Sequence, residues 1–180
     1  MPNFYNLQDV GEKKRFIYEA YDVIKKAIDK SEKDCANAHK WYGIILNYIG
    51  EFEGYRQQIL NSYEIRKHFE KALAINDKDP TTWHLLGVWH FACADLSYPL
   101  RLIAKTIFGT PPLSTFESAL EYFEKAESPN FYSRNTWYLA EVYERLGRYD
   151  EAKAFYLAAF KMPIITIDDI EVHRMVDLKY

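Results

Sequence analysis

Several features that mark secreted, membrane-spanning and nucleotide-binding proteins are scarce or missing in this sequence. Its 180 residues include only two cysteines, Cys35 and Cys93, which we expect to be buried free thiols of a reducing compartment. The seven glycines stand singly, so there is no glycine-rich loop of the kind that binds phosphate. No apolar stretch approaches the roughly 18 residues that would cross a membrane, and the N-terminus lacks a signal-peptide pattern.

Signatures of catalysis and metal binding are missing as well. His84 and His90 are six residues apart, which does not align them on one helix face, and the sequence has no H-E-x-x-H motif. His39 and His68 have no nearby pair of Cys or carboxylate residues at metal-binding spacing. We therefore expect no enzyme, no cofactor and no metal ion. The net charge of −3 also excludes a global attraction to polyanions, so we expect no nucleic-acid partner.

What the sequence does contain is an internal repeat. A small or aliphatic residue, a bulky residue and an alanine recur at steps of four and then three residues, which places all three on one helix face. Small side chains on either side of a large one let two helices approach closely, as stacked helical hairpins require. The pattern occurs four times, at Ala20–Ile24–Ala27, Ile65–Phe69–Ala72, Ala119–Phe123–Ala126 and Ala152–Tyr156–Ala159.

Each of the last three triplets follows a partner helix with features of the tetratricopeptide (TPR) repeat. The third unit carries Leu139–Ala140–Tyr143 and then Gly147, which tolerates the positive φ of a tight turn. The second unit opens with the W-x2-L-G pattern of Trp83–Leu86–Gly87. The first is looser, with Tyr42–Gly43 followed by Gly50 and Phe52, where we expect the turn.

The first two units are longer than the roughly 34-residue TPR consensus, by about ten and about twenty residues. We predict an all-α fold: a TPR-like antiparallel helical-hairpin array with insertions in the first two repeats and a C-terminal capping helix. The expected parts are an N-terminal helix in 1–33, three irregular repeats in 34–165 with an insertion at 97–113, and the capping helix in 166–180. Helices are expected at 7–30, 34–48, 52–75, 80–95, 98–108, 114–127, 131–146, 149–161 and 166–178. Ser114 with Glu117, and Thr166 with Asp169, have the spacing of helix-capping pairs.

Six short runs stand out: HKWYG at 39–43, GY at 54–55, HFEKAL at 68–73, WHLLGVW at 83–89, ADLS at 94–97 and FGTPP at 108–112. The stretch from WHLLGVW to FGTPP is the most specific, because it includes the insertion and not only the TPR consensus. In these runs the sequence resembles the regulator-of-microtubule-dynamics family, from about residue 10 to about residue 165. The resemblance implies a TPR-like domain that associates with microtubules and acts in spindle function and chromosome segregation. For some members it also implies association with mitochondria and lipid binding or transfer.

The insertion supplies the first candidate site. Arg101 and Lys105 lie four residues apart on one helix face, and no acidic residue occurs between Leu96 and Phe116. We interpret this helix as a basic surface for the acidic tails of tubulin. Its apolar residues also allow it to border a lipid-sized groove or to pack down over the end of the array. A second microtubule contact is predicted in the enlarged first unit, at Arg66, Lys67 and Lys71.

The concave groove of the array is the second candidate site. TPR domains that hold a peptide carboxylate use clustered Lys, Arg and Asn residues in this groove, and here that set is incomplete. The predicted lining is largely apolar, which favours a hydrophobic peptide helix or an acyl chain as the ligand. The alternative is that the N-terminal helix or the insertion fills the groove. The candidate groove residues are Lys40, Ile44, Asn47, His84, Val88, Phe91 and Trp137.

Taken with the resemblance, these features predict a non-enzymatic scaffold that binds tubulin or microtubules and regulates microtubule dynamics. The expected location is the cytoplasm, at the cytoskeleton or spindle, and the resemblance adds mitochondria. Two alternatives stay open: a lipid-binding or lipid-transfer module at organelle contact sites, and a generic peptide-binding TPR adaptor.

Overall fold

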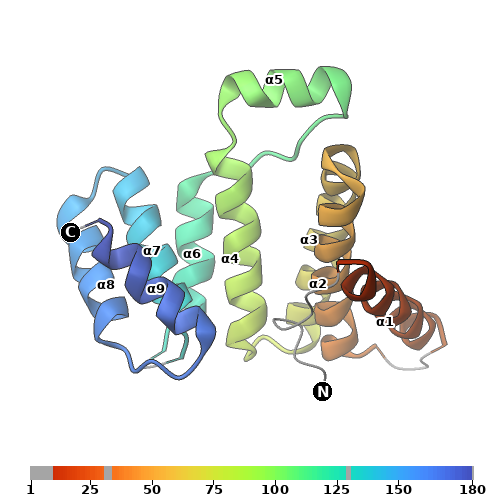
Figure 1. Ribbon diagram of the computed structural model, residues 1–180, viewed down its shortest axis with the longest axis horizontal. Helices are drawn as coiled ribbons and strands as arrows, with labels where there is room; N and C mark the ends of the chain where they lie inside the picture. The colour runs from red at the N-terminus through yellow and green to blue at the C-terminus, as the bar shows by residue number, and fades with distance from the viewer. Residues whose placement is uncertain (1–9, 31–33, 129–130, 180) are drawn as a thin grey trace. The chain divides into compact units, whose positions relative to one another are not determined.

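The computed structural model describes residues 10–30, 34–128 and 131–179. These residues form nine helices and no strand, which confirms the all-α prediction (Figure 1). The predicted helix start at residues 7–9 lies outside the described residues. Among the described helices, none is long and apolar enough to span a membrane. The helices are α1 (Val10–Lys30), α2 (Ala36–Glu53), α3 (Tyr55–Ile75), α4 (Pro80–Asp95), α5 (Tyr98–Ile107), α6 (Phe116–Ala126), α7 (Ser133–Arg145), α8 (Tyr149–Lys161) and α9 (Ile167–Asp177).

The chain divides into two compact units. The first contains α1, α2, α3 and α5, and the second contains α4 together with α6, α7, α8 and α9. The chain therefore crosses between the units three times. It enters the second unit for α4, comes back to the first for α5, and enters the second again before α6. The inserted helix thus belongs structurally to the first unit, although it interrupts the second repeat in sequence.

In the first unit, α2 and α3 form a hairpin around one close approach. A Cβ atom added at Gly43 would overlap the ring of Phe69, so only glycine lets the two helices come this near. The expected turn at Gly50 was wrong, because α2 continues through Gly50 and the chain turns at Gly54, where φ is +89°. Gly50 instead lets the backbone of α2 approach Gln58, whose Cγ would lie 3.1 Å from an added Cβ.

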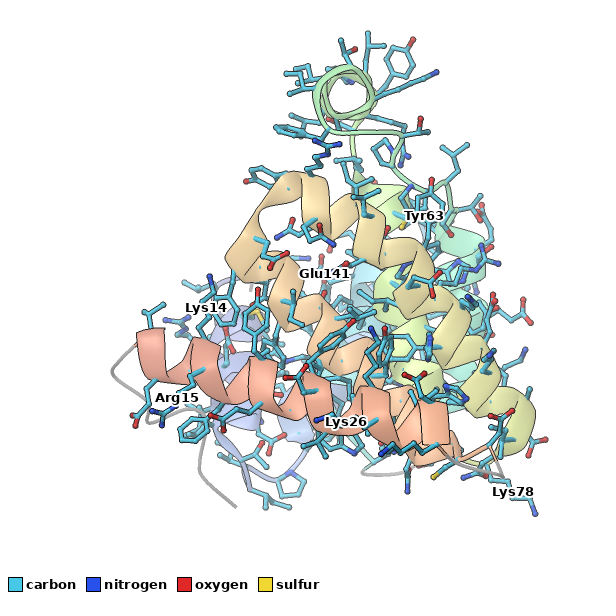
Figure 2. The ribbon with its side chains drawn as sticks, turned by 90° about the vertical axis from the view of Figure 1, so that its right-hand side faces the viewer. Lys14, Arg15, Lys26, Tyr63, Lys78 and Glu141 are labelled. Carbon is cyan, nitrogen blue, oxygen red and sulfur yellow. The ribbon has the colours of Figure 1, made fainter. Side chains whose placement is uncertain are left out.

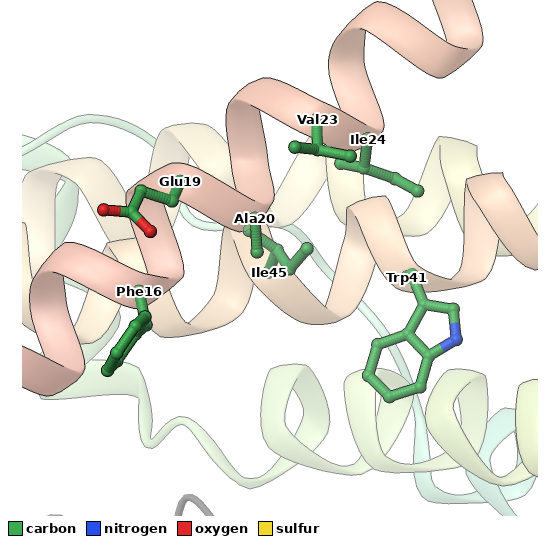
Figure 3. Close-up of a pocket in the computed structure, with 7 residues that line it drawn as sticks. All are labelled: Phe16, Glu19, Ala20, Val23, Ile24, Trp41 and Ile45. Atoms are coloured by element: carbon green, nitrogen blue, oxygen red, sulfur yellow. The ribbon is translucent and has the colours of Figure 1, made fainter. Parts of the chain in front are cut away.

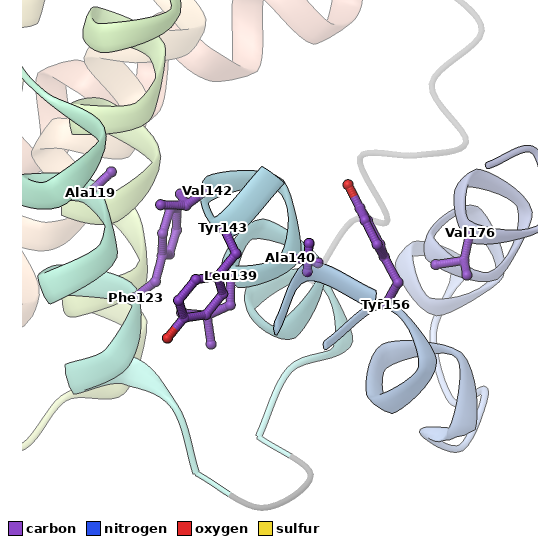
Figure 4. Close-up of a cluster of buried hydrophobic side chains, with 9 residues drawn as sticks. Ala119, Phe123, Leu139, Ala140, Val142, Tyr143, Tyr156 and Val176 are labelled. Carbon is purple, nitrogen blue, oxygen red and sulfur yellow. The ribbon is translucent and has the colours of Figure 1, made fainter. Parts of the chain in front are cut away.

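The second unit holds two hairpins with the same construction. Gly87 of α4 faces the ring of Phe123 in α6 as closely as Gly43 faces Phe69. In the next hairpin, Gly147 turns the chain between α7 and α8 with φ of +74°. A core of buried residues joins α6, α7, α8 and α9, with the rings of Phe123 and Tyr156 fully enclosed (Figure 4). These hairpins confirm the TPR-like architecture.

The two insertions are accommodated differently. The first unit takes up its extra residues by lengthening both helices of the hairpin, to 18 residues in α2 and 21 in α3. The insertion in the second repeat forms a separate helix, α5, and the loop that follows it. Because both helices of the hairpin are longer, the added residues lie inside helices, where backbone groups hydrogen-bond to one another, and no long loop marks the first insertion.

The last helix closes the second unit, as predicted. α9 packs on both α7 and α8, and buries Val172 and Val176 against them. Thr166 and Asp169 form the expected capping box at its start. The other expected cap was wrong: Thr115 rather than Ser114 precedes α6, and its side chain accepts the N–H of Ser118.

Both cysteines were predicted to be buried, and the structure corrects this. Cys35 is exposed at the residue before α2, and Cys93 is partly buried within α4. Neither forms a disulfide among the described residues.

Candidate functional site

The inserted helix α5 stands largely clear of the first unit. None of its residues is buried, so it is not packed down as a lid within that unit. It is anchored through neighbouring contacts: the Tyr63 hydroxyl of α3 donates to the Thr110 carbonyl over 2.9 Å, and the rings of Tyr55 and Phe108 lie 6.0 Å apart. Figure 2 labels Tyr63 on α3, below α5 in that view.

The two cations of α5 play different parts. The guanidinium of Arg101 points toward the following loop and donates to the carbonyls of Pro111 and Pro112, at 3.3 Å and 2.7 Å. Lys105 is exposed in the last turn of the helix. Arg101 therefore holds the loop after α5 through hydrogen bonds to Pro111 and Pro112, whereas the side chain of Lys105 is exposed to solvent.

Apolar side chains cover most of the remaining surface of α5. Leu102 is 53% exposed and Ile103 52%, and Tyr98, Leu100 and Ile107 are more exposed still. A soluble helix normally turns such residues toward a core, so a contiguous exposed set of this kind marks an interaction surface. The basic surface predicted from the sequence thus lies beside an apolar one.

The second predicted contact lies further along α3. Arg66 donates to Glu70 over 2.7 Å, and the ammonium of Lys67 lies 3.2 Å from Glu64. Lys71 is exposed two turns beyond Tyr63, a rise of about 12 Å. Both predicted basic groups belong to the first unit, but neighbouring carboxylates partly neutralise the one on α3.

The predicted groove residues are divided between the two units. Lys40, Ile44 and Asn47 lie on α2 of the first unit, and Asn47 donates to Glu51 over 3.1 Å. His84 lies on α4 of the second unit, where it is buried rather than open to a ligand. Its Nδ1 is 2.9 Å from Oδ1 of Asn135, and burial lowers the pKa of His84 to about 4.

The apolar groove residues of the second unit are partly covered by their own neighbours. Val88, Phe91 and Trp137 pack against the buried core. The Phe91 ring is 5.6 Å from Phe116 and 5.4 Å from Tyr138. The indole N–H of Trp137 is buried and has no acceptor among the described residues. A ligand in this groove remains a prediction.

Three charged residues of α7 contact α9 and the residues after it. Arg134 donates to Asp168 and Glu171, both at 2.7 Å. The ammonium of Lys179 contacts Glu141, at 2.5 Å, and Glu144. The hydroxyl of Tyr156 also lies within hydrogen-bond distance of both carboxylates, and burial, followed by these hydrogen bonds, raises the pKa of that phenol far above its ordinary value. This face of α7 is therefore closed.

Sequence reasoning missed a pair of buried histidines in the first unit. The Nδ1 atoms of His39 and His68 lie 2.9 Å apart, and Tyr42 stacks on the His68 ring. Burial, and next the neighbouring His39, lower the pKa of His68 to about 4. In the described part of the chain, no group of three or more His, Cys, Asp or Glu side chains is placed to hold a metal ion.

An apolar groove between α1 and α2 was also missed. It encloses about 400 Å³ (Figure 3). The signal was present in the sequence, because Ala20–Ile24–Ala27 is the only one of the four triplets without a predicted partner helix before it. The residues that line the groove are Phe16, Glu19, Ala20, Val23 and Ile24 of α1, and Trp41 and Ile45 of α2.

These helical hairpins define an all-helical protein of TPR-like architecture. The chain belongs to the family described as regulator of microtubule dynamics protein 1-3, whose model matches residues 3–179. Regulator of microtubule dynamics protein 1 of Bos taurus is 44% identical over 164 residues, covering 89% of this chain and 51% of the relative. The human protein of the same name is 42% identical, covering 89% of this chain and 52% of the relative.

A protein of the third subgroup, regulator of microtubule dynamics protein 3 of Xenopus laevis, is 31% identical, covering 91% of this chain and 36% of the relative. The chain thus spans about half the length, or less, of these relatives. Among solved structures, the crystal structure of MamA aligns with 96% of this chain and 99% of its own at 18% identity. Its TM-score is 0.38, too low to carry an argument.

Proposed function

We propose that the chain is a non-enzymatic scaffold that binds microtubules through α5 and thereby regulates their dynamics. The relatives are named as regulators of microtubule dynamics, which supports the partner. The observation that carries the proposal is the surface of α5: it has Lys105 exposed and no carboxylate anywhere between Leu96 and Phe116. An acidic tubulin tail would meet a positive surface there, although the whole chain has a charge of −3.

The contact is expected to be local and sensitive to salt. Attraction between exposed charges is screened beyond about 8 Å at physiological ionic strength, so only the residues nearest the tail contribute. Lys71 on α3 is the second expected contact, with Arg66 and Lys67 contributing less because Glu70 and Glu64 already engage them. Spindle function and chromosome segregation are the cellular roles that we propose for this binding.

Co-sedimentation of the purified chain with polymerised microtubules, across a salt series, tests the proposal. Lys105→Glu is expected to weaken binding at low salt without unfolding the chain, because the side chain is exposed. Lys153→Glu, an exposed lysine of α8 in the second unit, is the matched control and should bind like the unchanged chain. Arg101 is a poor test, since its loss would also release the loop at Pro111 and Pro112. Binding that survives Lys105→Glu would refute the role of α5.

A second candidate function rests on the apolar half of the same helix. Exposed Leu100, Ile103 and Ile107 share one face of α5, with Lys105 on another face, which is the pattern of a helix that lies in the interface of an anionic membrane. We propose lipid-surface binding as this alternative. Flotation with phosphatidylcholine vesicles, with and without phosphatidylserine, tests it: Ile103→Ser should reduce flotation, whereas Leu157→Ser, at an exposed leucine of α8, should not. No flotation with anionic vesicles would exclude it.

A further inference from the structure

Two buried histidines face each other between α2 and α3. His39, near the start of α2, is 1% exposed, and His68 of α3 is 8% exposed. Their Nδ1 atoms are 2.9 Å apart, which is hydrogen-bond distance. A hydrogen bond between two imidazole nitrogens needs a proton on one of them and a lone pair on the other. The two rings must therefore hold their protons differently, one on Nδ1 and the other on Nε2 only.

The outer nitrogen of each ring faces a carboxylate. Nε2 of His39 lies 3.6 Å from Asp34, just before α2, and Nε2 of His68 lies 3.9 Å from Glu64 of α3. In the uncharged pair, the ring that carries its proton on Nδ1 turns the lone pair of Nε2 toward its carboxylate, which is unfavourable. One added proton on that nitrogen removes the conflict, keeps the bond between the rings and makes it charge-assisted. The geometry therefore accommodates one extra proton.

A second extra proton has no place in this arrangement. It would have to bind the accepting Nδ1, and two N–H groups on cationic rings would then point at each other across 2.9 Å. Because both rings are buried, water does not screen the repulsion. The pKa of His68 agrees with this limit, since burial, and next the neighbouring His39, lower it to about 4. The two histidines therefore titrate as a pair, in two separate steps.

The charged groups around the rings do not remove this limit. On α3, Lys67 and Lys71 oppose a positive charge on His68, whereas Glu64 favours it. Asp34 lies beside the other ring. Both carboxylates are at the outer nitrogens, so they stabilise the first added proton. They do not compensate for the second, which would lie between the rings.

The pair also connects α1 to the hairpin of α2 and α3. Tyr42 of α2 stacks on the ring of His68, with the ring centroids 4.2 Å apart. The hydroxyl of Tyr42 lies 3.4 Å from that of Tyr21 on α1, and Asp29 is the charged group of α1 that acts on it. One continuous set of ring contacts thus runs from α1 through α2 to α3.

We propose that His39 and His68 form a proton-sharing latch, which holds α1, α2 and α3 together with up to one extra proton and opens when acid adds the second. Opening would separate the rings beside the close approach of Gly43 to Phe69, which are the next residues in each helix. Tyr42 would lose the ring on which it stacks, and α1 would lose a fixed contact on α2. The latch does not depend on the surface of α5, so either proposal can fail without the other.

Nitrogen NMR of the full chain with isotopically labelled histidine reads the protons directly. Near pH 7 we expect one ring of the pair with its proton on Nδ1 and the other with its proton on Nε2. As the pH falls, one added proton should appear first with the bond between the rings kept, and the second only near pH 4. Two rings in the same tautomer, or two rings that titrate with one common midpoint, would overturn the proposal.

His39→Asn separates the latch from other effects of acid. The side-chain oxygen of the new residue accepts the Nδ1–H of His68 but does not take up a proton, so the hydrogen bond survives at every pH. Amide exchange in α1, α2 and α3 of the unchanged chain, corrected for its intrinsic pH dependence, should rise about tenfold or more between about pH 6 and about pH 4. In His39→Asn the rise should be several-fold smaller, because burial still opposes a charge on His68 but the opposing imidazolium is gone.

His84→Asn is the matched control, at the buried histidine of the second unit, and should leave the rise in α1, α2 and α3 unchanged. An equal rise in the unchanged chain and in His39→Asn would show that acid acts elsewhere, and would overturn the latch. A rise confined to α2 and α3 would refute the link to α1 through Tyr42. If His39→Asn does not fold, as circular dichroism would show, the NMR titration of the unchanged chain decides alone.

Discussion

The two units of the molecule are built from the same repeat but end differently. The second unit is closed by α9, which buries its apolar face on α7 and α8, and Lys179 engages Glu141 and Glu144 on α7. The first unit has an uncovered triplet on α1 and an inserted helix, α5, without a buried residue. A repeat array needs a polar cap at its end, and α9 supplies one in the second unit, whereas the described residues of the first unit leave apolar side chains of α1 and α5 exposed. The exposed apolar side chains therefore make the first unit the better candidate for a binding surface.

The bulky residues at the centre of each triplet give the strongest test of this comparison. Tyr156→Ala should destabilise the chain by about 3–5 kcal/mol, because the fully buried ring leaves a cavity and two carboxylates lose its hydroxyl. Ile24→Ala, at the same position of the α1 triplet, should cost roughly 1 kcal/mol, because that side chain is already partly exposed. Urea denaturation of the two variants measures both effects. Equal losses would show that the α1 triplet is covered in solution.

Acid should destabilise both units through one buried histidine in each. The pKa values of His68 and His84 are lowered to about 4, below the value of about 6.5 expected in the unfolded chain. Both residues are therefore neutral in the folded chain near pH 7. As the pH falls from about 6.5 to about 4, the unfolded state takes up protons that the folded state excludes, and stability is lost. Below about pH 4 both states bind these protons, and this contribution to the slope ends.

The free energy of unfolding should fall by about 1.4 kcal/mol per pH unit for each histidine within that window. Urea denaturation between pH 7 and pH 4 measures the slope. His84→Gln removes the titrating group in the second unit, and His68→Gln removes it in the first. Each variant should therefore lower the slope of the unfolding free energy against pH by the contribution of one histidine, about 1.4 kcal/mol per pH unit. An unchanged slope in either variant would mean that the corresponding histidine stays hydrated in the folded chain.

Much of the fold followed from residue spacing alone. Seven of the described helices, α3 to α9, were predicted with both boundaries within about three residues, because caps, prolines and the triplets act locally. The end of α2 was misplaced, since Gly50 serves a close approach between helices and not a turn, and sequence does not distinguish these two uses of glycine. The burial of His84 was missed for a similar reason: its partner Asn135 lies 51 residues away.

The candidate sites were less predictable than the fold. The spacing of Arg101 and Lys105 correctly predicted that both lie on one helix. It did not predict that the Arg101 side chain donates to the carbonyls of Pro111 and Pro112. That contact depends on the path of the loop, which no local pattern specifies. The α1–α2 groove exists because no described residue covers the apolar side chains that line it. Such an uncovered surface can be recognised only once the positions of the neighbouring helices are known.

Removing the ammonium of Lys179 tests how firmly the second unit is closed. Lys179→Met should destabilise the chain by about 1–3 kcal/mol, because Glu141 is buried and would keep only Arg145, 3.4 Å away, as its cationic partner. Lys161→Met, an exposed lysine at the end of α8, is the control and should change stability little. Thermal denaturation followed by circular dichroism compares the two. If the variants behave alike, the charges on α7 do not hold the C-terminal segment.

The smallest effect is expected at the start of α9. Thr166→Ala removes the hydroxyl that accepts the N–H of Asp169, which should cost about 1 kcal/mol, whereas Thr166→Ser keeps the cap and should be nearly neutral. Amide hydrogen exchange shows where the loss falls. We expect faster exchange in α9 with α7 and α8 still protected, because the cap is local and the core of the hairpin lies elsewhere. The second unit would then open at its end without unfolding, and the apolar face under α9 would become accessible, as the α1 triplet already is. Uniformly faster exchange through all three helices would instead show that α9 is part of the same cooperative core.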